Sequence, residues 1–151
     1  MSSEIDAKDR EILGWLKSDG KMTVLQLSKK MGIPPTTIHN RIKQMEMSGV
    51  IRGYSIVVDK SKMGLPISVV ILATVQYDHS RTKKFSQKEV AKQIKNIRGV
   101  ESVEIVTGKV DMIVKANLES IQVLDEFILD KLRNIEGIGN TETLLVLTEL
   151  D

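Results

Sequence analysis

Residues 24–43 have the sequence VLQLSKKMGIPPTTIHNRIK, and this stretch decides the fold of the first third of the chain. It predicts two helices joined by a sharp turn. Gly32 ends the first helix, because glycine adopts a positive φ without strain, and Pro34-Pro35 begins the second. Two helices that cross steeply also need small residues where their backbones approach, and Ser28 and Gly32 occupy those positions.

A further helix is predicted before this stretch, from Asp6 to Ser18, with Asp6 as its N-cap. Thr23 is the N-cap candidate for the helix that follows. Apolar residues recur at helical spacing in all three segments, so we expect them to form one shared core. These core positions are Ile12, Leu13, Leu16, Leu25, Leu27, Met31, Ile33, Ile38, Ile42 and Met45.

The helix that follows Pro35 has a polar outer face. Its side chains are of the kinds that pair with base edges in the DNA major groove. We therefore predict a helix-turn-helix that binds double-stranded DNA; the alternative is a plain three-helix bundle whose polar face is only solvated. The candidate DNA-binding residues are Thr36, Thr37, His39, Asn40, Arg41, Lys43 and Gln44.

Charge is distributed unevenly along the chain. Residues 1–53 carry nine lysines and arginines against six acidic residues, whereas the other 98 residues carry 13 against 14. A local positive excess suits a surface that faces phosphates, because neutralising them releases counterions. A modest excess is more often only a solvated surface, so the helix pattern carries the prediction and the charge supports it.

The pattern changes near Arg52–Tyr54, and β-branched runs that alternate with amphipathic segments follow it. The order β-α-β-β-α-β predicts a ferredoxin-like αβ sandwich, so the fold class is α+β. Right-handed crossovers place both helices on one face of the sheet. We expect Val69, Ile71 and Ala73 to line the bare face and a second copy of the chain to cover it. The predicted strands are 67–77, 101–107, 111–118 and 138–148, and the predicted helices are 85–97 and 120–134.

Several functional classes find no support in the sequence. The chain has no cysteine, which excludes disulfides and thiolate metal sites. No apolar run is long enough to span a bilayer and the first residues lack the pattern of a signal peptide, so we expect a cytoplasmic protein without a membrane partner. Phosphate-loop, zinc-protease and nucleophile-elbow motifs are missing, so we predict no catalytic residue, no metal site and no cofactor.

Nearly the whole chain resembles the Lrp/AsnC family, the feast/famine transcriptional regulators of bacteria and archaea. No single matching stretch is specific, but their order and spacing are. The stretches are 6–13 (DAKDREIL), 27–33 (LSKKMGI), Arg41-Ile42 with Glu46, 49–51 (GVI), Gly53-Tyr54, Met63-Gly64 and 107–111 (TGKVD).

This resemblance implies a winged-helix-type DNA-binding domain at 1–52, a ribbon-like linker at 53–65, for which residues 56–58 also suggest a strand, and a ligand-sensing and oligomerisation domain at 66–151. It also implies dimers that assemble into tetramers or octamers and an amino acid effector bound between subunits. The alternative for Asp111 is a structural hairpin in which its carboxylate accepts backbone hydrogen bonds. The effector residues expected from the family motif and from the neighbouring last strand are Thr107, Gly108, Asp111, Thr141 and Thr143.

Two other functions remain open at this point. Some siroheme decarboxylase subunits resemble the same family, so the fold alone leaves an enzyme possible. An architectural DNA-binding protein is the second alternative, and it differs from a regulator in binding DNA without sequence preference. The basic loop at 79–84 is longer than the family pattern suggests, and we assign it no site.

Overall fold

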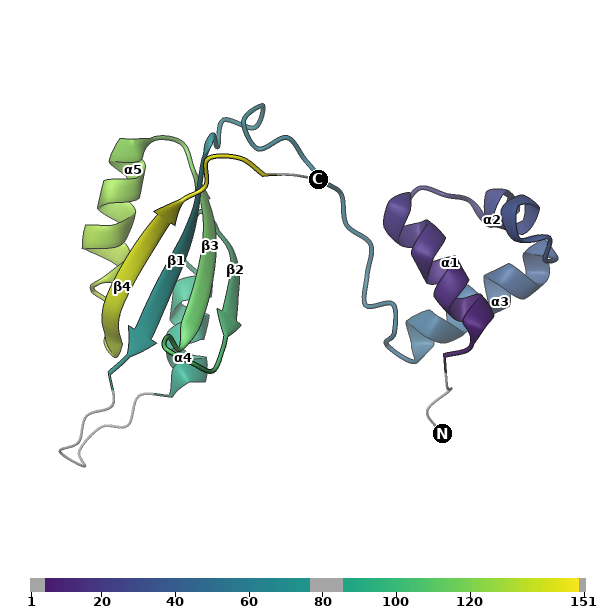
Figure 1. Cartoon of the computed structure of the whole chain (residues 1–151), viewed down its shortest axis with the longest axis horizontal. Helices are drawn as coiled ribbons and strands as arrows, with labels where there is room; N and C mark the ends of the chain where they lie inside the picture. The colour runs from purple at the N-terminus through teal and green to yellow at the C-terminus, as the bar shows by residue number, and fades with distance from the viewer. Residues whose placement is uncertain (1–4, 77–85, 150–151) are drawn as a thin grey trace. The chain divides into compact units, whose positions relative to one another are not determined.

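The computed structural model describes residues 5–76 and 86–149. The chain divides into two compact units, Met1–Val57 and Val58–Asp151 (Figure 1). The basic loop 79–84 and the predicted ends of a strand at Tyr77 and of a helix at Phe85 lie outside the described residues. Each unit has its own hydrophobic core, so the two are described separately.

The first unit consists of three helices, α1 (Ala7–Ser18), α2 (Val24–Met31) and α3 (Pro35–Met47). All three predicted helices are therefore confirmed. Two capping boxes begin α1 and α2: the Asp6 carboxylate accepts the Asp9 N–H at 2.8 Å, and the Thr23 hydroxyl accepts the Gln26 N–H at 3.2 Å. Side-chain caps of this kind satisfy backbone donors that the first turn leaves free.

Gly32 ends α2 in the left-handed conformation, with φ at +65°, as the sequence predicts. The expectation that Gly32 also provides room for a close approach of two backbones is wrong. A Cβ at this position meets nothing within 4 Å. The requirement for glycine is therefore conformational, since L side chains disfavour positive φ. Ser28 clamps the turn instead, because its hydroxyl donates to the Ile33 carbonyl at 2.6 Å.

The core of the first unit gathers one or two buried side chains from each helix. Leu25 was expected in this core, but it lies on the surface and is 63% exposed. The other predicted core residues are buried or pack against the buried cluster. The fully or nearly fully buried members are Ile12, Leu27, Ile38 and Met45.

The second unit has the predicted β-α-β-β-α-β order, and its four antiparallel strands lie in the order β2-β3-β1-β4. The second helical segment begins as α5 and continues as a short π-helix, η1. The α+β fold class is thereby confirmed. The elements are β1 (Ile67–Val75), α4 (Gln87–Lys95), β2 (Val100–Ile105), β3 (Met112–Leu118), α5 (Ile121–Glu126), η1 (Phe127–Leu132) and β4 (Ile138–Leu145).

The helices cover the face of the sheet that the sequence analysis expected to be bare. Val69, Ile71 and Ala73 are buried in the core with side chains of α4 and η1, so their assignment to the uncovered face is wrong. The residues between them on β1 face the other way, because successive side chains in a strand alternate. The uncovered face therefore carries Val70 and Leu72, both of them half-buried.

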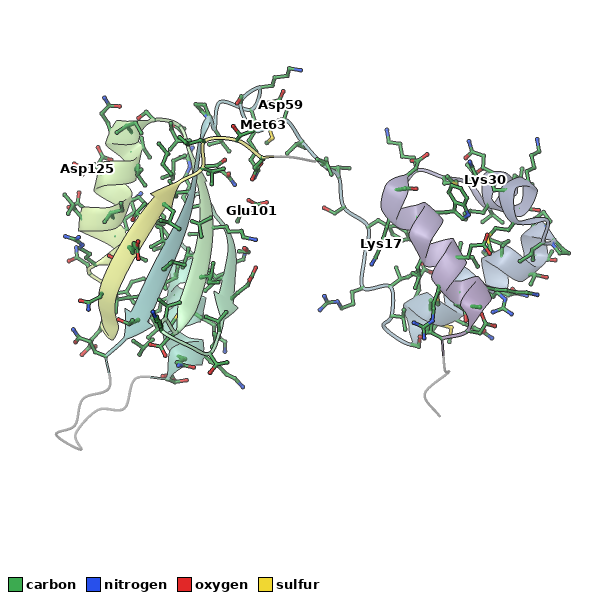
Figure 2. The ribbon with its side chains drawn as sticks, viewed as in Figure 1. Lys17, Lys30, Asp59, Met63, Glu101 and Asp125 are labelled. Atoms are coloured by element: carbon green, nitrogen blue, oxygen red, sulfur yellow. The ribbon has the colours of Figure 1, made fainter. Side chains whose placement is uncertain are left out.

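No helix or strand forms between residues 51 and 66, so the strand expected at 56–58 is absent from this described segment. A single hydrogen-bonded turn precedes β1: the Leu65 N–H donates to the Lys60 carbonyl at 2.9 Å, and the Lys62 N–H donates to the Asp59 carboxylate at 3.1 Å. Met63 and Asp59 both lie on this turn (Figure 2).

Candidate nucleic-acid interface and ligand region

The seven candidate DNA-binding residues all lie on α3, and most of their side chains point away from the core. Thr37 and Arg41 are half-buried. The opposite side of α3 buries Ile38 and Met45, which fixes the orientation of the helix in its unit. The exposed members of the set are Thr36, His39, Asn40, Lys43 and Gln44.

Arg41 does not extend outward from α3. Its Nη1 donates to Asp6 Oδ2 at 2.7 Å and to Asp9 Oδ1 at 2.8 Å, so α3 is tied to the N-terminus of α1. The pKa of Arg41 is raised by these two carboxylates, first by the hydrogen bond to Asp9. The pKa of Asp6 is lowered, first by the hydrogen bond from the Asp9 amide and then by Arg41. The structure therefore gives Arg41 a role within the unit that the sequence analysis missed.

The N-terminus of α3 lacks a side-chain cap. Pro34 and Pro35 have no N–H, and the amides of Thr37 and Ile38 donate to the Pro34 carbonyl at 3.0 and 3.2 Å. The Thr36 N–H has no partner among the described residues. A free amide at the positive end of a helix dipole is a favourable place for an anion.

Two further contacts brace the first unit. Lys30, labelled in Figure 2, places its ammonium 4.3 Å from the ring centroid of Trp15, so α2 is held to α1 by a cation–π contact. The Tyr54 hydroxyl donates to Glu46 at 2.8 Å and holds the chain after α3 against that helix. Burial and the neighbouring Glu46 raise the pKa of Tyr54, so it remains a donor at neutral pH.

The candidate effector residues gather at one end of the sheet. Thr107 and Gly108 lie in the exposed connection between β2 and β3, and Asp111 directly precedes β3. Thr141 pairs with Ala73, whose carbonyl accepts the Asp111 N–H at 3.0 Å, so β1 brings these residues close. Thr143 lies two pairs further into the sheet, opposite Ile71.

The carboxylate of Asp111 has partners within the unit. Oδ2 accepts the Val75 N–H at 2.8 Å, and Oδ1 accepts a hydrogen bond from the Gln87 side chain at 2.9 Å. Asp111 therefore braces the end of β1 and the start of α4, which is the structural alternative that the sequence analysis weighed. An effector that pairs with this carboxylate would share it with these two donors.

A polar network lies at the end of the sheet away from Asp111, where it joins the turn before β1 to β2, to β3 and to the chain after β4. Lys60 Nζ lies 3.2 Å from carboxylate oxygens of both Glu101 and Glu149. Asn117 donates to Glu101 at 2.8 Å and accepts from the Ser68 hydroxyl at 2.8 Å. The Asn117 hydrogen bond lowers the pKa of Glu101, and Lys60 lowers it further. No sequence motif marks these residues, since they come together only through the pairing of strands.

Residues 5–76 and 86–149 lack both a clustered set of metal ligands and a membrane-spanning helix. This part of the chain contains no group of three or more histidines and carboxylates that is placed to hold a metal ion. None of its helices is both long enough and apolar enough to cross a bilayer.

Comparison with known proteins agrees with this geometry. Residues 5–52 match the family described as "Winged helix-turn-helix DNA-binding", and residues 71–151 match the "Lrp/AsnC ligand binding domain". Over 145 residues the chain is 36% identical to an uncharacterized HTH-type transcriptional regulator of Pyrococcus horikoshii, with 96% of this chain and 94% of that protein covered.

Two further proteins show the same relationship. The HTH-type transcriptional regulator FL11 of Pyrococcus furiosus is 35% identical over 147 residues, which cover 97% of this chain and 92% of that protein. The structure of AsnC from E. coli is 28% identical and has a TM-score of 0.79, with 97% of this chain and 94% of that chain covered. These relatives are regulators and both matched domains are regulatory, so the decarboxylase alternative is not favoured.

Proposed function

Since this chain belongs to the Lrp/AsnC family of DNA-binding transcriptional regulators, we propose that α3 reads a specific DNA sequence and that a small molecule bound by the second unit modulates the binding. The single observation that carries the DNA part is the polar surface of α3. The helix is fixed by Ile38 and Met45 on one side and presents exposed Asn40, Lys43 and Gln44 on the other.

Different residues of α3 have different proposed roles. Asn40, Gln44 and His39 contact base edges in the major groove, where amide side chains pair well with adenine. Lys43 contacts a phosphate, and Thr36 offers both its hydroxyl and its free backbone amide to another. The half-buried Thr37 follows Thr36 on α3 and lies beside these proposed phosphate contacts. Arg41 positions α3 against α1, because two carboxylates already hold its guanidinium.

We propose a homodimer that pairs the uncovered faces of two sheets. Val70 lies opposite Leu144, and Leu72 lies opposite Ile113, so four apolar side chains form a diagonal patch across β3, β1 and β4. Lys115 beside Val70 and Glu142 beside Leu72 border this patch on the same face. A patch of this kind usually has a partner. Two subunits then present two α3 helices to half-sites about one helical turn (~34 Å) apart. Larger assemblies of such dimers, tetramers or octamers, are the family's pattern.

The proposed effector region is the end of the sheet that carries Thr107, Gly108, Asp111, Thr141 and Thr143. An amino acid is the expected effector: backbone amides of the connection suit its carboxylate, and Asp111 suits its ammonium group. The match of residues 71–151 to a ligand-binding domain supports an effector in this unit. The effector can change DNA binding only if it binds two states of the protein with different affinities.

The DNA part is tested by selecting bound sequences from a random library, followed by affinity measurements over a range of salt concentrations. Lys43→Ala is expected to weaken binding to all sequences alike and to reduce the salt slope by about one. Asn40→Ala is expected to cost about 1–3 kcal/mol at one base position only. Lys88→Ala in α4 is the charge-matched control. Binding with no sequence preference would favour the architectural alternative, and no binding at low salt would refute the proposal.

The dimer is tested by light scattering on the full chain. Leu72→Arg places a charge in the middle of the apolar patch and is expected to shift the protein to monomers. Lys92→Glu on α4 serves as a surface control. An unchanged mass for Leu72→Arg would show that another surface holds the subunits together.

A further inference from the structure

The second unit contains a cavity of about 610 Å³ at the end of the sheet opposite the Thr107–Asp111 connection. This volume is within the range of small-molecule sites, about 300–1,000 Å³. One wall is the turn that carries Met63, which Figure 2 shows just before β1. The apolar lining consists of Met63, Leu65, Leu118, Val123 and Phe127.

The charges of this cavity lie at its rim. Arg98 and Glu119 form an ion pair at 3.0 Å, with side chains that are 88% and 55% exposed. Lys131 projects from η1, is exposed, and has no ion-pair or hydrogen-bond partner in the described part of the chain. Two cations against one carboxylate leave the rim with a positive excess, which favours an anionic group on an occupant.

The floor of the cavity is closely packed, and the Asn117 side chain there already has hydrogen-bond partners. Gly99 has φ at +96°, and a Cβ there would lie 2.7 Å from a Leu118 methyl group and 3.1 Å from the Asn117 carbonyl oxygen. The loop that carries Arg98 is therefore packed directly on the end of β3. The Asn117 side chain is bonded to Ser68 and Glu101. An occupant must consequently bury an apolar body inside and find its polar partners at the rim.

We propose that this cavity binds a small carboxylate with an apolar body. Lys131 and Arg98 hold the carboxylate. The accessible apolar side chains of the lining, Met63, Leu65 and Val123, contact the body. An α-amino acid with an apolar side chain also brings an ammonium group to Glu119, whereas the corresponding α-keto acid meets only the two cations. The site lies within one protomer and is distinct from the proposed effector region around Asp111.

A ligand in the cavity contacts the turn that precedes β1, at the start of the second unit. Met63 and Leu65 belong to the turn that begins the second unit, and Lys60 in the same turn is paired with Glu101 and Glu149. A ligand that fits one arrangement of this turn better than another shifts the balance between them. Only this regulatory consequence rests on the proposed DNA-binding function; occupation of the cavity itself does not.

The test is calorimetric titration of the full-length protein with L-norleucine, its α-keto acid and its decarboxylated amine, which share one apolar body. We expect the two carboxylates to bind and the amine to give no heat. Lys131→Glu is expected to weaken binding at least about tenfold, and Lys92→Glu, the same change on an exposed lysine outside the cavity, is expected to leave it unchanged. Tighter binding of the amino acid than of the keto acid assigns Glu119 to the ammonium group, and Glu119→Gln removes that difference.

Two results would overturn this inference. The first is the absence of binding by both carboxylates at millimolar concentration. The second is binding that survives Lys131→Glu but is lost in Asp111→Asn, because the ligand then occupies the other end of the sheet. These titrations do not depend on DNA binding, so either proposal can be refuted without refuting the other.

Discussion

Arg41 Nη1 lies 2.8 Å from Asp9 Oδ1, so α3, the proposed recognition helix, is tied by an ion pair to the first turn of α1. The same nitrogen lies 2.7 Å from Asp6 Oδ2. The Arg41 side chain is 25% exposed and that of Asp9 is 13% exposed, which makes this pair less solvated than a typical surface pair. The position of the polar surface of α3 therefore depends on a charged side chain that is bonded within the unit.

Arg41→Gln is expected to destabilise the first unit, and a double-mutant cycle with Asp9→Asn is expected to give a coupling of about 0.5–1 kcal/mol. Unfolding in urea, followed by the fluorescence of Trp15, measures this, since Trp15 is the only tryptophan of the chain and lies in α1. Arg10→Gln, an exposed arginine of α1, is the control.

The same variants separate positioning from base reading. If Arg41 positions α3, Asp9→Asn weakens specific DNA binding as Arg41→Gln does. If Arg41 instead reads a base, Asp9→Asn releases the guanidinium and strengthens binding. An increase in affinity for Asp9→Asn would therefore contradict the positioning role.

Acid is expected to destabilise the first unit through Asp6. Its pKa is lowered in the folded protein from an ordinary value of 3.8, so the native state binds fewer protons than the unfolded state. The stabilisation is complete above the ordinary value and is lost as the pH falls through the lowered one. Trp15-monitored urea unfolding over an acid pH series tests this. Asp6→Asn is expected to flatten the decline, and an unaltered pH profile in that variant would exclude Asp6 as its source.

Gly32→Ala is expected to cost about 1–2 kcal/mol, because alanine must adopt a left-handed conformation at φ +65°. Gly32→Asn is expected to cost less, since asparagine tolerates that conformation better. No residue beyond its chain neighbours lies within 4 Å of a Cβ at this position, so packing against other side chains does not contribute. Equal losses for alanine and asparagine in urea unfolding would point to a cause other than backbone conformation.

Asp111→Ala is expected to destabilise the second unit by about 1–3 kcal/mol, because the N–H of the buried Val75 loses its acceptor. Asp111→Asn keeps an oxygen for that N–H and is expected to recover most of the loss while removing the charge. Scanning calorimetry follows this transition. An amino acid effect on DNA binding that disappears in Asp111→Asn would then reflect the charge and not the fold, whereas an equal loss of stability in both variants would argue against the N–H as the important partner.

The helix-turn-helix and the β-α-β-β-α-β order of elements along the chain were predicted because their signals are local. The capping boxes at Asp6 and Thr23 and the positive φ of Gly32 depend on residues that are at most a few positions apart. Leu25 was misplaced because periodicity defines a helical stripe but not its exact width. The set Thr107, Gly108, Asp111, Thr141 and Thr143 came from the family resemblance and the neighbouring last strand, and the hydrogen bonds of Asp111 to Val75 and Gln87 depend on tertiary contacts that no local signal gives.

The assignment of the sheet faces failed for a specific reason. Residues 67–75 read ISVVILATV, in which both alternating sets are largely apolar. Alternation separates Val69, Ile71 and Ala73 from Val70 and Leu72, but it does not say which set the helices cover.

The sequence by itself determined the two units, the turn at Gly32 and the polar surface of α3, since each arises from the conformational preferences and periodicity of neighbouring residues. The tertiary structure alone decided that Arg41 faces Asp6 and Asp9, and that Arg98, Glu119 and Lys131 surround one cavity. Those groups are separated by tens of residues along the chain and interact through space, so their distances are set by how helices cross and strands pair. No local pattern records that geometry.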